Sequence, residues 1–353
     1  MEKSVAHTST NRNTGLDLLK IFACFAVVVI HVSANKWYDV DCTSFEWKVF
    51  TVYNCFSRWA VPVFVMISGS LFLKADYTVE RLYKKYILRI ATAFLAWTCV
   101  YTAVNYIRYR NVPDAVKMFF SGDYHMWYLY MIAGLYMITP LLKKLVEDEK
   151  LTRYFLLLAF VFAFLIPEII SFVSMFSKYA ASIMQGVISK IHLDFVLGYT
   201  FYYILGYYLT NLTLSKKQIR TAACLGIVGF IATLGMTVGF TYYKGGLVKL
   251  FYDYLTVNIL LTAVPVFLLY DKFNKINFSD KARHIITQLS KYSFGVYLVH
   301  VLLIYFLGYF LHLDTLSLNP ILSVPVISII VFTGSYIISA VLNNIPILKK
   351  YIV

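Results

Sequence analysis

The chain has 353 residues, of which 60% are hydrophobic and only 14% charged, and its mean hydropathy is +0.68. A soluble domain has roughly 45–50% apolar and about 25% charged residues, so this composition excludes a soluble enzyme and indicates a polytopic membrane protein. The net charge of +14 is assigned to cytoplasmic loops rather than to nucleic-acid binding, because no basic helix carries interleaved stacking aromatics.

Ten apolar runs are long enough to cross a bilayer, which takes ~20 residues over ~30 Å of hydrocarbon. We expect helices at about 14–35, 49–73, 84–107, 124–146, 151–173, 192–211, 219–243, 251–271, 287–311 and 320–343. The predicted fold is an all-α bundle of about ten transmembrane helices. We expect a single domain over 1–353, with no cleaved signal peptide and no fused soluble domain.

Basic residues divide unequally between the two sides of this topology. The connecting segments on the side of the N-terminus hold 21 Lys and Arg, and those on the other side hold 9. Because excess positive charge marks the cytoplasm, we expect both termini inside, in a cell (inner or plasma) membrane. The outer segments 108–123 and 174–191 are expected to hold short interfacial helices.

The first run, "GLDLLKIFACFAVVVIHVSA", keeps three titratable side chains. Lys20 and His31 are eleven residues apart, so they project from one helix face about 16 Å apart along the axis. Asp17 lies three residues before Lys20, within reach of an ion pair. The residues fit either a polar path through the bundle or an interfacial pair plus a hydrogen-bonded histidine.

The second run contains "FSRWAVPVFVMISGSLFL". Arg58 lies near mid-depth, costs ~2.5–3.5 kcal/mol to insert, and cannot shed its proton, so it needs an anion or water. Pro62 interrupts the backbone hydrogen bonds nearby. Ser68 and Gly69 allow close approach, either by another helix or by a ligand.

The fourth and ninth runs add further polar side chains. Asp123, His125 and Trp127 occupy the outer end of the fourth run, where an aromatic belt with a helix cap is the alternative reading. Tyr297 lies three residues before His300, which is near mid-membrane in the ninth run. This intramembrane polarity favours a functional path over a scaffold.

Three carboxylates lie near the outer ends of other helices, each either a helix cap or an acceptor-site ligand: Glu168, Asp194 and Asp253. The five cysteines are scattered without CxxC spacing, so we expect no metal site and no disulfide framework.

Four motifs occur in order: a basic residue ten positions before a histidine, "PVFVMISGSLFL", "HMWYLYMIAGLYMITPLL" and "SFGVYLVH". With ten predicted helices, they resemble the acyltransferase-3 family of integral membrane acyltransferases. The stretch "NCFSRWAVPVFVMISG" looks most similar to the branch that O-acetylates enterobacterial common antigen and other surface polysaccharides.

The resemblance implies transfer of an acyl group, usually acetyl, from cytoplasmic acetyl-CoA to a hydroxyl of a surface glycan or its lipid-linked precursor. His31 matches the motif histidine, the proposed base or acyl relay. Lys20 matches a basic position that is usually Arg and contacts the donor, and Asp17 matches an acidic position before it. The lysine lacks the bidentate fork of arginine, which alters how the donor is held.

Residue chemistry supports the same reaction. A neutral imidazole such as His31 can take a proton from a sugar hydroxyl. Arg58 and Ser68 are candidates for donor binding, and Arg58 can also stabilise an oxyanion. Supporting roles fall to Asp17, His125, Trp127, Tyr297 and His300.

The main alternative is a transporter or exporter of a small polar solute or acylated sugar, since inward-facing polar residues also fit solute carriage. A related variant is the amino-acid-handling membrane domain of some family members. No inverted repeat or paired broken helices favour transport. The residues do not distinguish acetyl from succinyl, the acceptor sugar, a covalent acyl-enzyme from direct transfer, or the oligomeric state.

Overall fold

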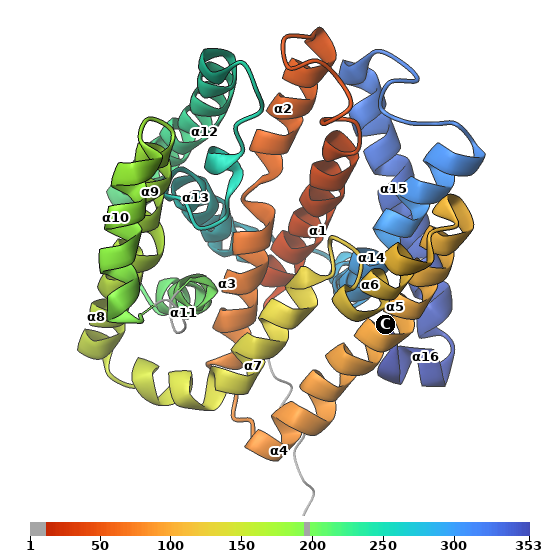
Figure 1. Cartoon of the computed structure of the whole chain (residues 1–353). Coiled ribbons are helices and arrows are strands. Elements are labelled where there is room, and N and C mark those ends of the chain that lie inside the picture. The colour runs from red at the N-terminus through yellow and green to blue at the C-terminus, as the bar shows by residue number, and fades with distance from the viewer. Residues whose placement is uncertain (1–11, 194–197) are drawn as a thin grey trace, which may run out of the picture.

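The computed structural model describes residues 12–193 and 198–353, which form helices and no strand (Figure 1). Within these residues, nine helices are long and apolar enough to span a membrane. The predicted all-α polytopic bundle is therefore confirmed. The helices run in the order α1 (Thr14–Ala34), α2 (Phe45–Ser57), α3 (Ala60–Phe72), α4 (Val79–Arg81), η1 (Leu82–Ile87), α5 (Leu88–Tyr109), α6 (Val112–Ser121), α7 (Trp127–Val146), α8 (Glu149–Ala159), η2 (Phe160–Leu165), α9 (Ile166–Ser174), α10 (Lys178–Ile188), η3 (Ser189–Ile191), α11 (Tyr199–Thr210), α12 (Lys216–Lys244), η4 (Leu250–Tyr252), α13 (Val257–Asn274), α14 (Asp280–Phe310), α15 (Pro320–Asn343) and α16 (Pro346–Tyr351).

Helix α1 lies in the interior of the bundle and packs on α2, α3, α13, α14 and α15. Its N-terminus is capped by Asn13, whose side chain accepts a hydrogen bond from the Leu16 amide at 2.9 Å. Most of its length is buried, from Gly15 to Ser33. Polar side chains on this helix therefore face protein or a cavity on most sides, as intramembrane charges require.

The second predicted span is broken into α2 and α3 at Arg58 and Trp59. Pro62 has no amide hydrogen, so the carbonyl four residues earlier, at Arg58, loses its helical donor. The chain continues through the break by a bond from the Val63 amide to the Trp59 carbonyl at 3.0 Å. Arg58 and Trp59 keep right-handed helical backbone angles, so α2 and α3 continue as one membrane-spanning segment, Phe45–Phe72.

The sixth predicted span, 192–211, is not one continuous helix. Gly198, with φ of 75°, precedes α11, which has 12 residues and a length of about 18 Å, less than a bilayer core. Helix α10 doubles back beside α9, and α11 is seen nearly end-on in Figure 1. The segment 174–191 is thus helical as expected, but it packs on α9.

Two pairs of glycines allow the close helix contacts expected in lipid. A Cβ at Gly69 of α3 would lie 1.8 Å from the Tyr203 carbonyl oxygen of α11. From the other side, a Cβ at Gly206 would lie 2.0 Å from the Met66 carbonyl oxygen. In α12, Gly226 and Gly229 approach α13 in the same way.

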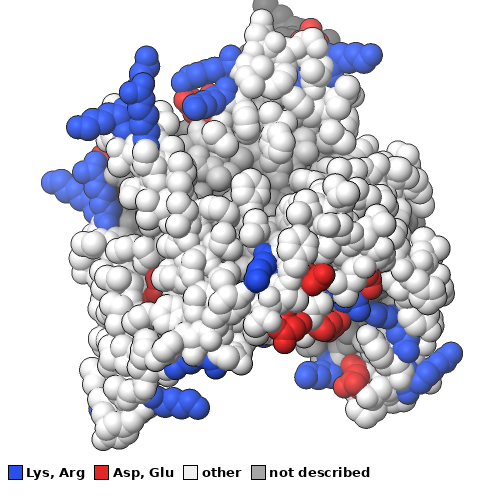
Figure 2. Space-filling model, turned by 90° about the horizontal axis from the view of Figure 1, so that it is seen from above, with Lys and Arg blue, Asp and Glu red and all other residues white. Residues whose placement is uncertain are grey.

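The beginning of α1, together with α4 and α16, lies toward the lower end of the bundle in Figure 1. Figure 2 views the upper end, where acidic and basic side chains are mixed on a mostly uncharged face. There Lys36 bridges Asp39 at 3.2 Å and Asp314 at 3.8 Å, which ties the connection after α1 to the one after α14.

Candidate active site

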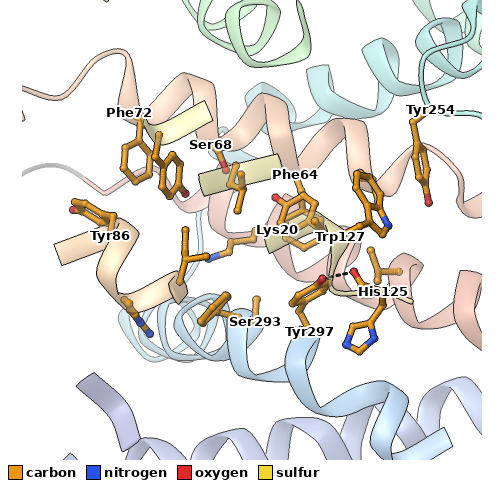
Figure 3. Close-up of a pocket in the computed structure, with 18 of the residues that line it drawn as sticks. Lys20, Phe64, Ser68, Phe72, Tyr86, His125, Trp127, Tyr254, Ser293 and Tyr297 are labelled. Carbon is orange, nitrogen blue, oxygen red and sulfur yellow. Dashed lines mark hydrogen bonds between the residues drawn. The ribbon is translucent and has the colours of Figure 1, made fainter. Parts of the chain in front are cut away.

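A cavity of about 280 Å³ lies between α1, α3, η1, α5, α7 and α14. Lys20 and His31 of α1 both line it, as their spacing on one helix face predicts. Figure 3 shows Lys20 reaching between the wall that carries Ser68 and the wall that carries Ser293. The aromatic lining is supplied mainly by Phe64, Phe72, Tyr86, Trp127, Tyr128, Tyr136, Tyr254, Phe294 and Tyr297.

A second cavity, of about 530 Å³, shares Lys20, Arg89 and Phe294 with the first. Its lining carries five cationic side chains and one carboxylate: Arg12, Lys20, Arg89, Lys291 and Lys349, with Asp17. We call this space the basic vestibule. A hollow with this excess of positive charge attracts an anionic ligand, and its shared wall leads to the first cavity.

Asp17 is bound in the basic vestibule, but not by Lys20. Arg12 donates to both of its carboxylate oxygens, and the Ser290 hydroxyl of α14 donates to Oδ1 at 2.5 Å. Lys20 makes no salt bridge in the described part of the chain. The predicted Asp17–Lys20 ion pair is therefore wrong, because two other donors occupy the carboxylate, and the Lys20 ammonium faces both cavities.

Arg58 lies outside the lining of both cavities. Its guanidinium carbon stacks 4.7 Å from the Tyr252 ring centroid and 5.4 Å from that of Tyr254, which does line the first cavity. Its Nε donates to Asn54 Oδ1 at 2.7 Å, and Asn54 in turn donates to Ile30 of α1. Aromatic faces and an amide thus accommodate the charge.

Ser68 and Gly69 of α3 lie in different surroundings. Gly69 packs on α11, and Ser68, one position earlier, faces the first cavity. Trp127 also lines the cavity and stacks on Tyr254 with ring centroids 6.0 Å apart, which is more specific than an interfacial belt.

Three histidines from distant parts of the sequence meet beside the first cavity. The ring centroid of His31 lies 4.9 Å from His300 and 6.2 Å from His125, and His125 lies 5.3 Å from His300. His125 and His300 are almost fully buried. The Tyr297 hydroxyl donates to the His125 carbonyl at 2.5 Å, the dashed line in Figure 3. Helix α14 thereby fixes the position of the segment before α7.

Two groups of site residues escaped the sequence reading. Arg89, Arg12, Lys291 and Lys349 were counted only as cytoplasmic charges, although they line the basic vestibule. Asp123 was named at the outer end of the fourth run without a role in the site, and its side chain is buried beside His125. The sequence signal that could have identified Asp123 as a site residue is its position two residues before His125, at the beginning of an apolar run.

Of the outer carboxylates, Glu168 and Asp253 line one further cavity of about 280 Å³. Glu168 accepts from the Val257 amide and Asp253 from the Leu255 amide, both at 2.8 Å. Asp194 lies outside the described residues. No cluster of three or more His, Cys, Asp or Glu in the described residues has the arrangement of a metal site.

Comparison with known proteins bears on the class of this site. Residues 13–340 match the model of the acyltransferase-3 family, described as an acyltransferase domain. An amino-acid racemase of Enterococcus faecalis is 31% identical over 152 residues, which is 38% of this chain and 20% of the racemase. The chain thus matches about a fifth of that relative's length. No solved structure matches. Because the family model covers nearly the whole chain, this multi-pass membrane protein belongs to the acyltransferase-3 family of membrane acyltransferases.

Proposed function

We propose that the protein is a membrane O-acyltransferase, most simply an O-acetyltransferase. It moves the acyl group from cytoplasmic acyl-CoA to a hydroxyl of a surface polysaccharide or its lipid-linked precursor. The observation that carries this proposal is the junction of the two cavities at Lys20 and Arg89. It joins a hollow suited to phosphate groups with one that is lined by His31 and His125.

The basic vestibule suits the charged end of coenzyme A, whose phosphates require several cations. Lys20 and Arg89 stand where the two spaces meet, so a narrow arm held there can extend toward His31, about 16 Å along α1. The apolar and aromatic walls beyond them exclude water, which protects the thioester from hydrolysis.

In the proposed reaction, His31 takes the proton of the acceptor hydroxyl as the oxygen attacks the thioester carbonyl. The new carbon–oxygen bond forms, the carbon–sulfur bond breaks, and the proton passes from His31 to the departing thiolate. Lys20 and Ser68 contact the donor, and Trp127 and Tyr297 shape the space around the reacting groups. Arg58 lies outside the cavity and contributes indirectly, because its guanidinium stacks on the ring of Tyr254, which lines the cavity.

The experiment uses the purified chain in lipid nanodiscs with radiolabelled acetyl-CoA or succinyl-CoA, measuring released coenzyme A and label on an added extract of lipid-linked glycans. We expect His31→Ala to insert normally and lose roughly 100- to 10,000-fold in transfer. Lys20→Ala should raise the KM for the donor by about tenfold or more, and Lys20→Arg should retain activity. Lys281→Ala, an exposed change on α14, is the matched control.

Full activity of His31→Ala would contradict the proposed base. Solute uptake into proteoliposomes without donor consumption would instead favour the transporter, and amino acids are the first solutes to try, given the racemase similarity. Mass spectrometry of surface glycans from cells with and without the gene tests the acceptor class. Loss of one acetyl per repeat is the expected result. The same spectra test the proposed kinship with the branch that modifies enterobacterial common antigen.

A further inference from the structure

The Asp123 side chain is a buried carboxylate that has no lysine or arginine partner among the residues that the structure describes. It is only 2% exposed and lies between α6 and α7. His125 Nδ1 lies 3.3 Å from its Oδ1, and the Tyr305 hydroxyl of α14 donates to its Oδ2 at 3.1 Å. No lysine or arginine comes within 4.0 Å of it in the described residues. A buried carboxylate needs a countercharge, and among the described residues His125 is the ionisable base in direct contact with it.

The hydrogen-bond partners define which ring nitrogens of the two buried histidines carry a hydrogen. His300 Nδ1 lies 2.6 Å from the Tyr297 carbonyl oxygen, which can only accept, so Nδ1 is the donor. His125 Nδ1 donates to the Asp123 carboxylate by the same argument. The Nε2 atoms of both rings are buried and have no hydrogen-bond partner in the described residues, so each keeps a free lone pair. The ring centroids of His125 and His300 lie 6.2 and 4.9 Å from that of His31.

Neighbouring groups hold this arrangement in place. The Tyr101 hydroxyl donates to the Leu298 carbonyl at 2.7 Å and accepts from the Leu302 amide at 3.1 Å, which anchors α5 to the turn of α14 that carries His300. The Tyr101 ring lies 5.1 Å from that of His125. The other titratable or charged groups around the cluster are Arg58, Tyr124, Tyr297, Tyr305 and Arg108.

We propose that Asp123, His125 and His300 are positioning residues that orient His31 and share its positive charge when it takes the acceptor proton. This inference rests on the proposed acyl transfer. The negative charge of Asp123 favours the protonated state of the cluster, which exists while the hydroxyl proton is held by imidazole.

The test measures kcat, KM and their pH dependence with radiolabelled acetyl-CoA and the glycan extract in nanodiscs. For Asp123→Asn we expect kcat to fall roughly 10- to 100-fold, with the donor KM changed by less than about twofold. Without the carboxylate, the protonated cluster is less favoured, so the acid limb of kcat/KM should move to lower pH. His300→Gln and His125→Gln should also lower kcat.

A misfolded variant would lose donor binding together with turnover, so the unchanged KM separates positioning from structure. Asp123→Glu should recover part of the kcat that Asp123→Asn loses. Tyr305→Phe removes one hydroxyl donor, which is shared between the two Asp123 oxygens, and should cost only a few-fold in kcat. His284→Gln, an exposed histidine on the same helix as His300, is the matched control.

An Asp123→Asn variant with full kcat and an unshifted pH profile would overturn the inference and leave the proposed function intact. A wild-type protein that consumes no acetyl-CoA or succinyl-CoA would overturn the proposed function itself, and with it this inference.

Discussion

The contact between α3 and α11 sets the position of Ser68 in the first cavity, and Gly69→Ala tests it. The added Cβ would lie 1.8 Å from the Tyr203 carbonyl oxygen, whereas ordinary contact begins at 3.4 Å. The helices must therefore separate by about 1.6 Å, which is the difference between these two distances. Backbone atoms cannot rotate away as a flexible side chain can, so the whole wall of the cavity moves.

Overpacking of this kind costs about 1–3 kcal/mol of stability, and a displacement of ~1 Å in a site can cost about 100-fold in rate. We expect Gly69→Ala to lower the unfolding midpoint in nanodiscs and to reduce acyl transfer by 10-fold or more on that scale. Gly206→Ala, on the other side of the contact, should behave alike, because its Cβ would meet the Met66 carbonyl at 2.0 Å.

Gly235→Ala is the matched control, since nothing lies within 4 Å of a Cβ there. Because alanine is favoured over glycine inside a helix, this variant should have the same free energy of unfolding as the wild type or one that is higher by about 0.5–1 kcal/mol. If Gly69→Ala and Gly235→Ala gave the same unfolding midpoint and the same activity, the close contact and its role in placing Ser68 would be refuted.

Three further predictions concern charge. Arg58→Lys should lower stability by about 1 kcal/mol in detergent unfolding, because the ammonium keeps the charge but loses the planar stack on Tyr254. Lys143 Nζ lies 2.9 Å from Asp76 Oδ1 and lowers the pKa of Asp76 below its ordinary value of 3.8. The ion pair therefore stabilises the folded protein above pH 3.8, and this stabilisation disappears as the pH falls through the folded-state pKa. Asp76→Asn should therefore show a smaller drop in unfolding midpoint between pH 7 and pH ~3, and an equal drop would contradict the pairing. The KM for the acyl donor should rise with ionic strength, because salt screens the cations of the basic vestibule. Arg89→Gln should make the KM depend less steeply on ionic strength. If this variant left the dependence unaltered, the donor phosphates would bind elsewhere.

The approach of Lys20 and His31 to one cavity was predictable, because both lie on one helix and helical geometry alone sets their relation. The break at Arg58 was foreshadowed by Pro62 for a similarly local reason. The ion pair of Asp17 with Arg12 is also local in sequence, but it replaces the pair expected with Lys20. The second donor to Asp17, Ser290, belongs to α14, and no local rule states that α14 packs on α1.

Hydrophobic runs and the distribution of basic residues determined that this chain is a helical membrane protein, since bilayer thickness imposes a length that any sequence reading can detect. Tertiary structure alone decided that His31, His125 and His300 meet, that Asp123 is buried beside them, and that scattered cations form one vestibule. Hydropathy encodes how deep a residue lies in the membrane. It does not encode which helices are neighbours, because lipid-facing and helix-facing apolar side chains are alike in composition.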